Sequence, residues 1–313
     1  MGDRIVIISG ANSGIGRAAA IKFATEGFHV VMACRNLSAS QSVQQEIIEK
    51  SGNDKVSLLE LDLASYQSIR HFCTVFQQTY KQLDVLIHNA AYLKHGEKNY
   101  QLSPDHIELS FATNLFGPFL MTKLLMDTLQ RSSDARILHA CSTNIKHFFD
   151  PKRKIEFDNL QGELKDNRPY NTYKMYGDSK MALFIMTKRL AMELKPYGIT
   201  VNALQIPATK ISKRTIDNLS PGWRVLAVLQ NLINPLPDAV ADCYYQICTA
   251  EKYANLSGQL FNKQGEIIQP GQRKPDPLTQ AKQIFSSTYY PAYADDPDVA
   301  QQVWELCTKL TLH

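Results

Sequence analysis

The sequence predicts an α/β protein in which helices cover both faces of a parallel β-sheet. Short apolar segments alternate along the chain with longer segments of helical character, an order typical of strand–helix–strand units. The first apolar segment, residues 4–9, reads R-I-V-I-I-S, as expected for a strand buried on both faces. A glycine-rich loop follows this strand directly.

The same pattern gives the individual elements in order. Strands are expected at 4–9, 29–34, 56–61, 84–88, 136–141, 199–205 and 260–261, where short apolar runs occur. Helices are expected at 17–26, 38–50 (opened by a Ser cap), 65–80, 105–129, 173–194 and 296–310. The segment 267–291 reads as an irregular excursion before the last helix. No internal repeat or low-complexity tract is present.

Composition excludes several classes of protein. The chain has 313 residues, 44% of them apolar, enough for a sizeable core. Its net charge of +4 is small and its basic residues are scattered, so nothing requires a nucleic-acid partner. The six cysteines form no Cys-x-x-Cys pair and no metal-ligand spacing with histidine, so we expect buried, reduced thiols and no metal site. No apolar leader precedes the first strand, and we expect a cytoplasmic protein without a transmembrane segment.

The glycine loop has the pattern Gly10-x-x-x-Gly14-x-Gly16, between a strand and a helix. Glycines allow a tight turn and a close approach of backbone N–H groups to phosphate, and the helix N-terminus favours an anion. This pattern differs from the Gly-x-Gly-x-x-Gly loop of other dinucleotide folds. A purely structural turn is the alternative, which the position after the first strand disfavours.

Tyr176 and Lys180 are four residues apart in the helix expected at 173–194, so their side chains share one face. A positive charge roughly 5 Å from a phenol, at an effective dielectric of ~20, favours the phenolate by about 3 kcal/mol. The pair therefore predicts a tyrosine with a lowered pKa that acts in general acid–base catalysis. Taken alone, the Tyr-x-x-x-Lys pattern is weak, because Tyr173 and Tyr176 also fit a plain helix face.

Taken together, the glycine loop, the segment around Asn89, Ser142 and the Tyr176/Lys180 pair resemble the short-chain dehydrogenase/reductase family over about residues 4–262. The segments 33–36 and 159–163 and the tail 296–310 are most similar to its retinol dehydrogenase-like branch. The resemblance implies one doubly wound (Rossmann-type) domain. It has a cofactor-binding half at about 1–135, a catalytic and substrate-binding half at about 136–262 with a lid at about 211–237, and a C-terminal extension at 263–313.

The resemblance also implies roles for four residues. Tyr176 is expected to be the general acid/base, and Lys180 to lower its pKa and bind the nicotinamide ribose. Ser142 is expected to hold the carbonyl oxygen, although a strand-end cap is the alternative. Asn114 resembles the asparagine that kinks its helix and holds a water that links Lys180 to solvent. Asparagine is locally unfavourable inside a helix, although a plain surface Asn remains open.

The expected cofactor is NADP(H) rather than NAD(H). NAD-preferring relatives place an acidic residue at the end of the second strand, where this chain has Cys34 followed by Arg35. A guanidinium can bind a 2′-phosphate bidentately. The alternative is that Arg35 is solvated and that the enzyme does not discriminate between NADP(H) and NAD(H). Asp62 resembles the aspartate that binds the adenine amino group. The full expected cofactor set is Gly10, Asn12, Ser13, Gly14, Ile15, Gly16, Arg35, Asp62, Leu63, Asn89, Ala90, Tyr176, Lys180, Pro207 and Ser212.

Several positions depart from the family pattern. Ser9 replaces the usual Thr, Ala91 and Ala208 occupy glycine positions, and Ser212 stands for the usual Thr that contacts the carboxamide. Between Ser142 and Tyr176 lies a long insertion, 146–170, and the apolar segment 211–237 resembles a substrate lid. That apolar segment favours a bulky hydrophobic substrate, while packed core, a subunit contact or contact with a membrane surface remain open.

The sequence thus predicts an NADP(H)-dependent oxidoreductase that interconverts an alcohol and a carbonyl on a hydrophobic small molecule. The branch points to a retinoid, although many relatives reduce other lipophilic aldehydes and ketones. The competing prediction is a cofactor-binding regulator or scaffold without turnover, which the changes at Ala91 and Ala208 support and the retained Tyr176 and Lys180 oppose. A homodimer or homotetramer is compatible with the family.

Overall fold

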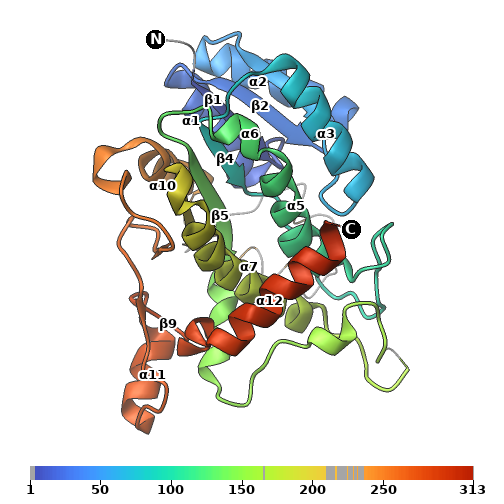
Figure 1. Ribbon diagram of the computed structural model, residues 1–313, viewed down its shortest axis with the longest axis vertical. Coiled ribbons are helices and arrows are strands. Elements are labelled where there is room, and N and C mark those ends of the chain that lie inside the picture. The colour runs from blue at the N-terminus through green and yellow to red at the C-terminus, as the bar shows by residue number, and fades with distance from the viewer. Residues whose placement is uncertain are drawn as a thin grey trace.

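The computed structural model describes residues 4–164, 166–208, 216, 224, 228, 231 and 236–312. A parallel sheet forms its centre (Figure 1), with the strand order β3-β2-β1-β4-β5-β6-β7. The strands are β1 (Ile5–Ser9), β2 (His29–Cys34), β3 (Val56–Glu60), β4 (Val85–His88), β5 (Arg136–Ser142), β6 (Thr200–Ile206) and β7 (Leu260–Phe261). The expected doubly wound α/β fold in a single domain is confirmed.

Helices cover the two faces of this sheet. The first face carries α1 (Gly14–Thr25), α2 (Leu37–Ser51) and α10 (Pro237–Thr249), and the second carries α3 (Tyr66–Thr79), α5 (Gly117–Leu124), α7 (Thr172–Leu194) and α12 (Pro297–Thr311). Successive residues of a strand point to opposite faces, so in β1 Val6 and Ile8 pack under the first set while Ile5 and Ile7 pack under the second. This double burial explains the continuous apolar run at the N-terminus.

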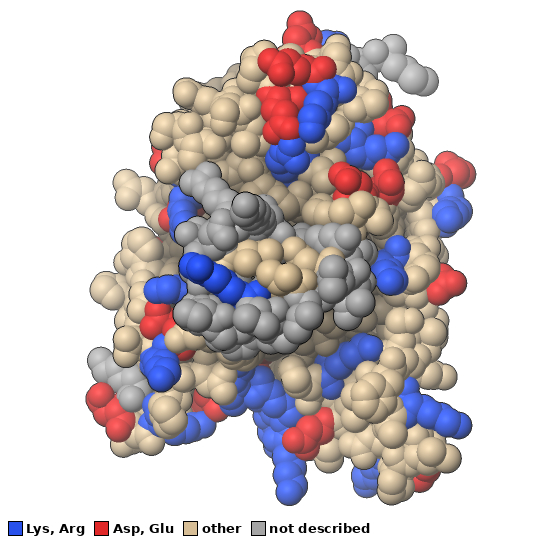
Figure 2. Space-filling model, turned by 180° about the vertical axis from the view of Figure 1, so that it is seen from behind, with Lys and Arg blue, Asp and Glu red and all other residues tan. Residues whose placement is uncertain are grey.

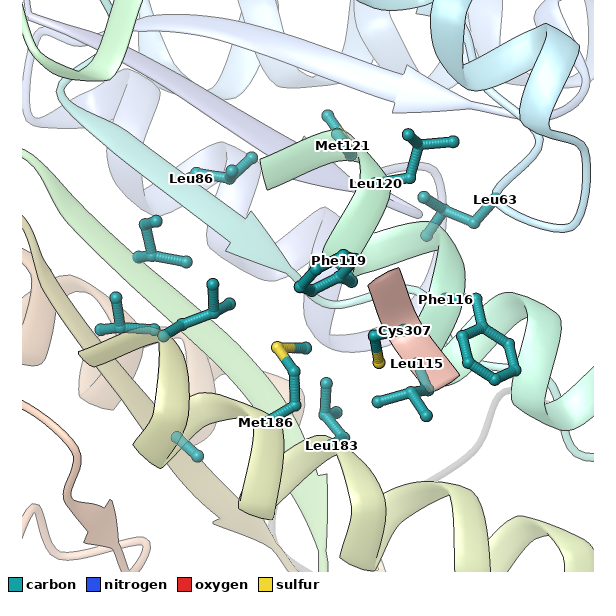
Figure 3. Packing of buried hydrophobic residues seen from close by; sticks show 14 of the residues in the cluster. Leu63, Leu86, Leu115, Phe116, Phe119, Leu120, Met121, Leu183, Met186 and Cys307 are labelled. Carbon is teal, nitrogen blue, oxygen red and sulfur yellow. The ribbon is translucent and has the colours of Figure 1, made fainter. Parts of the chain in front are cut away.

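The C-terminal helix α12 completes the core of the second face. Cys307 of α12 lies between Leu183 and Met186 of α7 and Leu115 of the neighbouring helical layer (Figure 3). Trp304 packs edge-on against Phe119 of α5, with ring centroids 5.4 Å apart. The extension therefore belongs to the same hydrophobic core as α7. All six cysteines are buried and free, as expected.

Three sequence expectations on the elements are wrong. The helix expected at 105–129 is broken into α4 (Leu109–Phe111), a π-helical turn η1 (Ala112–Phe116), α5 and α6 (Met126–Leu129). Helix α2 is capped by Asn36, whose Oδ1 accepts from the backbone N–H of Ala39, and not by a serine. The excursion at 267–291 holds β8 (Gln269–Pro270), α11 (Pro277–Phe285) and β9 (Tyr289–Tyr290), and β8 and β9 pair in parallel.

The remaining short elements are 3₁₀ turns: η2 (Thr143–Phe149), η3 (Phe157–Asn159), η4 (Lys195–Tyr197), η5 (Glu251–Tyr253) and η6 (Ala292–Asp295). Among the described residues we find no helix with the length and apolar character that a membrane span requires.

Candidate active site at the carboxyl edge of the sheet

The candidate site lies where the order in which successive strands are added across the sheet reverses. Strands β1 and β4 are neighbours, but β2 and β3 extend the sheet to one side of them and β5 to β7 to the other. Parallel sheets bind ligands at such a reversal, outside the carboxyl ends of the strands. A cleft of about 500 Å³ opens there. Its lining includes the expected residues Gly10, Asn12, Ser13, Gly14, Ile15, Arg35, Asp62, Leu63, Asn89 and Ala90.

The glycine loop is shaped by its glycines. Gly10 and Gly14 have φ values of +67° and +52°, which L side chains rarely adopt. At Gly16 a Cβ atom would collide with the carbonyl oxygen of Gly10 and the side-chain amide of Asn89. Gly16 itself lies beneath the loop and does not line the cleft. The loop therefore needs all three glycines, two for backbone conformation and one for close packing.

Asn89 joins the glycine loop to β4. Its Nδ2 donates to the backbone oxygen of Ser9 at 2.9 Å, while its Oδ1 accepts from the hydroxyl of Tyr244 at 3.2 Å. The Ser9 hydroxyl accepts from the backbone N–H groups of Asn89 and Ala90, both at 3.0 Å. Sequence reasoning missed Tyr244, because α10 is far along the chain and a single tyrosine there carries no local signal.

Arg35 lies exposed at the mouth of the cleft, directly after β2. The preceding Cys34 is buried and points toward the backbone of Ala11 and Asn12, which donate hydrogen bonds to its sulfur; burial nevertheless raises the pKa of this thiol. The position expected to select the cofactor thus carries a neutral, inward-facing thiol and an outward guanidinium. Asp62 accepts from the backbone N–H of Ala64 at 2.9 Å, which fixes its carboxylate at the cleft.

Tyr176 and Lys180 lie on α7, which begins after the cap Asn171, and face the end of β5. The Lys180 Nζ donates to the backbone oxygen of Ala140 in β5 at 2.7 Å and lies 5.8 Å from the centroid of the Tyr176 ring. Tyr176 also hydrogen-bonds to the side chain of Ser142. The structure therefore brings Ser142, more than thirty residues earlier in the sequence, next to Tyr176 and Lys180.

The expected lowering of the tyrosine pKa is wrong for this structure. The pKa of Tyr176 is raised to about 12, chiefly by burial; the hydrogen bond with Ser142 lowers this pKa, and the buried Cys141 thiol raises it. Burial also lowers the pKa of Lys180 to about 8. The lysine is anchored on β5 and is itself desolvated, so its charge does not overcome the burial of the phenol.

Ser142 does act as a strand-end cap, the alternative reading of its position. Its hydroxyl oxygen accepts from the backbone N–H of Asn144 at 3.2 Å, at the start of η2. This bond uses an oxygen lone pair and leaves the hydroxyl proton available as a donor. Capping and substrate binding are thus compatible at this residue.

Asn114 is buried in the π-helical turn η1, so it is not a surface asparagine. Its Oδ1 accepts from the backbone N–H of Tyr92 at 2.7 Å, and its Nδ2 donates to the Tyr92 carbonyl at 3.2 Å and to Ser179 Oγ at 3.0 Å. π-Helical turns are concentrated at functional sites. The irregular helix expected at Asn114 is therefore present, and the Asn114 amide connects the cleft-lining residue Tyr92 to α7.

The insertion 146–170 is tied to α7 by buried charges. Asp178 of α7 is fully buried and forms ion pairs with Arg153 at 2.6 Å and Lys174 at 2.9 Å. Tyr170 donates to the buried carboxylate of Glu108 at 2.6 Å, and burial raises the pKa of Glu108. The ion pairs Arg153–Asp178 and Glu156–Lys174, the latter at 3.0 Å, hold the insertion against the helix that carries Tyr176, whereas Tyr170 ties it to the residue before α4.

The remaining predicted positions follow β6. Pro207 is partly buried and Ala208 exposed, and neither borders the cleft described above. Ser212 and most of the expected lid at 211–237 lie outside the described residues. Tyr92 and Thr113 line the cleft but were not predicted; the position of Tyr92 directly after Asn89-Ala90-Ala91 was the available signal.

Comparisons with known proteins agree with this arrangement. Residues 4–149 match the family model for short chain dehydrogenases. Human retinol dehydrogenase 13 is 29% identical over 310 residues, covering 98% of this chain and 84% of that protein. Mouse retinol dehydrogenase 12 is 32% identical over 262 residues, covering 83% of this chain and 77% of that protein.

Solved structures support the fold. A short chain dehydrogenase from Escherichia coli CFT073, complexed with NADPH, superimposes with a TM-score of 0.63 at 21% identity, covering 84% of this chain and 98% of that one. Sequence, fold and relatives lead to the same class, and the chain belongs to the short-chain dehydrogenase/reductase family of oxidoreductases, in its retinol dehydrogenase-like branch.

Proposed function

We propose that this protein is an NADP(H)-dependent oxidoreductase that reduces an aldehyde or ketone on a hydrophobic small molecule to the alcohol. One observation carries the proposal: Tyr176, Ser142 and Lys180 meet at the end of β5, on the same edge of the sheet as the glycine-loop cleft. The reaction direction rests on the protonation states that burial imposes on Tyr176 and Lys180.

The cleft fits a dinucleotide. Gly10 and Gly14 of the loop line it without side chains, and the helix α1 begins at Gly14 with its N-terminus toward the cleft. Arg35, exposed at the mouth, would hold the 2′-phosphate of NADP(H), and Asp62 would bind the adenine. When bound, the cofactor supplies the hydride that adds to the carbonyl carbon.

The chain's own residues handle the proton. The Ser142 hydroxyl donates to the carbonyl oxygen and fixes its position. Tyr176, with its pKa near 12, carries its proton at neutral pH and donates it to the oxygen as negative charge develops there. Lys180 lies 5.8 Å from that ring, and its positive charge stabilises the phenolate as it forms.

The same protonation states disfavour alcohol oxidation at neutral pH, because that direction requires Tyr176 to begin as a phenolate. We therefore propose reduction as the faster direction near pH 7. The relatives' names make retinal the first substrate to test. Asn114 would act as a positioning residue, since its amide is fully engaged by Tyr92 and Ser179.

The test offers the purified protein NADPH or NADH with a panel of hydrophobic aldehydes and ketones, retinal included, and follows cofactor oxidation. We expect turnover with NADPH and much slower turnover with NADH. Tight NADPH binding without turnover of any carbonyl, or of any alcohol with NADP⁺, would instead identify a cofactor-binding regulator of the same fold.

A further inference from the structure

Helix α11 presents its apolar side chains to solvent and its polar side chains to the protein. Leu278 and Phe285, seven residues apart and therefore on one face, are 66% and 87% exposed. On the opposite face, Gln283 is 2% exposed and Gln280 is partly buried. A surface helix of a globular protein normally has the reverse arrangement.

This orientation is fixed by specific contacts on the inner face. The Gln283 Oε1 accepts from the backbone N–H of Gln272 at 2.9 Å, and the Gln280 side chain donates to the Phe149 carbonyl at 3.3 Å. A Cβ at Gly271 would collide with the Gln283 amide, so the glycine makes room for it. The parallel pair β8–β9 joins the segments before and after the helix, and together these contacts keep the polar face of α11 against the protein.

The exposed apolar residues are concentrated in this segment. Among the described residues, eleven large hydrophobic side chains are exposed, and four of them, Leu278, Ile284, Phe285 and Tyr289, fall within twelve residues. Scattered exposed hydrophobics need no explanation, whereas a contiguous group marks an interaction surface. We call these four residues the α11 ridge.

Basic residues accompany the ridge. Lys282 follows Leu278 by four residues and shares its face, and Arg273 and Lys274 precede the helix, all three exposed. The single acidic residue between 272 and 288 is Asp276, whose carboxylate is used to cap α11 through the N–H groups of Leu278 and Thr279. In Figure 2, Lys and Arg side chains predominate over Asp and Glu along the lower part of the face.

We propose that the α11 ridge docks onto an anionic lipid bilayer. Exposed apolar side chains beside lysines are the composition that places a short amphipathic helix in the membrane interface. A second copy of the chain fits less well, because two basic patches repel and the projecting nine-residue helix (Figure 1) is small for the roughly 800 Å² that each partner of a stable interface buries. The proposal does not depend on catalysis.

Vesicle flotation of the full chain tests the docking. The probes are vesicles of phosphatidylcholine alone and vesicles in which about a third of the lipid is phosphatidylserine. We expect binding to the anionic vesicles, weakened by salt, and a loss of about tenfold or more in Leu278→Gln/Phe285→Gln and a smaller loss in Lys282→Glu. Matched controls are Met192→Gln, at a site 68% exposed on α7, and Lys309→Glu on α12, which retain binding.

A second readout places the ridge itself in the lipid. In Phe285→Trp, we expect the added tryptophan fluorescence to shift to the blue and to be quenched by brominated acyl chains only with anionic vesicles. Absence of binding to either vesicle, or equal binding by Leu278→Gln/Phe285→Gln, would overturn the proposal. So would a concentration-dependent dimer that this double variant dissociates, since a second copy would then cover the ridge.

Discussion

The Lys180 ammonium donates a hydrogen bond to the carbonyl oxygen of Ala140, 2.7 Å away, and thereby fastens helix α7 to strand β5. Lys180 is 2% exposed, so this bond forms away from water. The ammonium group of Lys180 therefore has a fixed position near Tyr176, and keeping it charged away from water costs free energy. Two of the predictions below follow from this relationship.

The reductive activity should depend on pH through Lys180. Burial lowers the pKa of Lys180 to about 8, so its charge, which stabilises the phenolate of Tyr176, is lost as the pH rises through that value. We expect kcat for carbonyl reduction to be level below pH 7 and to fall above about pH 8. Lys180→Arg keeps its charge throughout, and its lower kcat should show no fall near pH 8. A wild-type profile that rises from pH 7 to 9 would contradict this role.

The buried charge of Lys180 should also make the free energy of unfolding depend on pH. The folded pKa of Lys180 is about 8 and the unfolded value 10.5, so between these values the unfolded state binds more protons and stability rises with pH. Below pH 8 the burial of the charged lysine lowers the free energy of unfolding by its full amount, about 3 kcal/mol. Relative to Lys180→Met, wild type should gain stability from pH 8 toward 10.5, measured by urea unfolding. Lys309→Met, at an exposed site, serves as the control for the loss of a surface lysine. A difference between Lys180→Met and wild type that stays constant with pH would contradict this cost of burial.

The amino-acid sequence was sufficient to predict the layers and most of the site. Continuous apolar runs and the glycine loop are local signals, and they placed β1, β2 and the cleft correctly. The sequence pattern did not show that the expected helix 105–129 is interrupted around Asn114, because the apolar periodicity continues through the π-helical turn η1. The side chain of Asn114 binds Tyr92, which is distant in the sequence. The pKa of Tyr176 depends on burial from the whole tertiary structure, which no spacing in α7 contains.

The glycine loop should be intolerant of a methyl group at Gly16. Gly16→Ala would place a Cβ against the Gly10 carbonyl and the Asn89 amide, and we expect a loss of about 3 kcal/mol together with weakened NADPH binding. Gly177→Ala is the matched control, because a Cβ in this helix would meet only ordinary contacts. We expect it to stabilise α7 by about 0.5–1 kcal/mol. Thermal unfolding and cofactor titration measure both effects, and an unchanged Gly16→Ala protein would refute the packing argument.

Arg35 should determine the choice of cofactor. Arg35→Ser removes the guanidinium at the mouth of the cleft, and we expect NADPH affinity to fall about tenfold or more while NADH affinity stays unchanged. Arg131→Ser, at an exposed site before β5 and so at the opposite edge of the sheet, controls for net charge. Isothermal titration with both cofactors gives the comparison. Equal losses for NADPH and NADH would show that Arg35 does not recognise the 2′-phosphate.

The most direct test of the proposed chemistry compares wild type, Tyr176→Phe and Tyr173→Phe in NADPH oxidation with the best carbonyl substrate. Tyr173 lies one turn earlier on α7, so its variant controls for loss of a hydroxyl on the same helix. We predict that Tyr176→Phe binds NADPH normally but loses kcat by about a thousandfold, while Tyr173→Phe retains most activity. Turnover by Tyr176→Phe at the wild-type rate would contradict the assignment of Tyr176 as the proton donor, and with it the proposed mechanism.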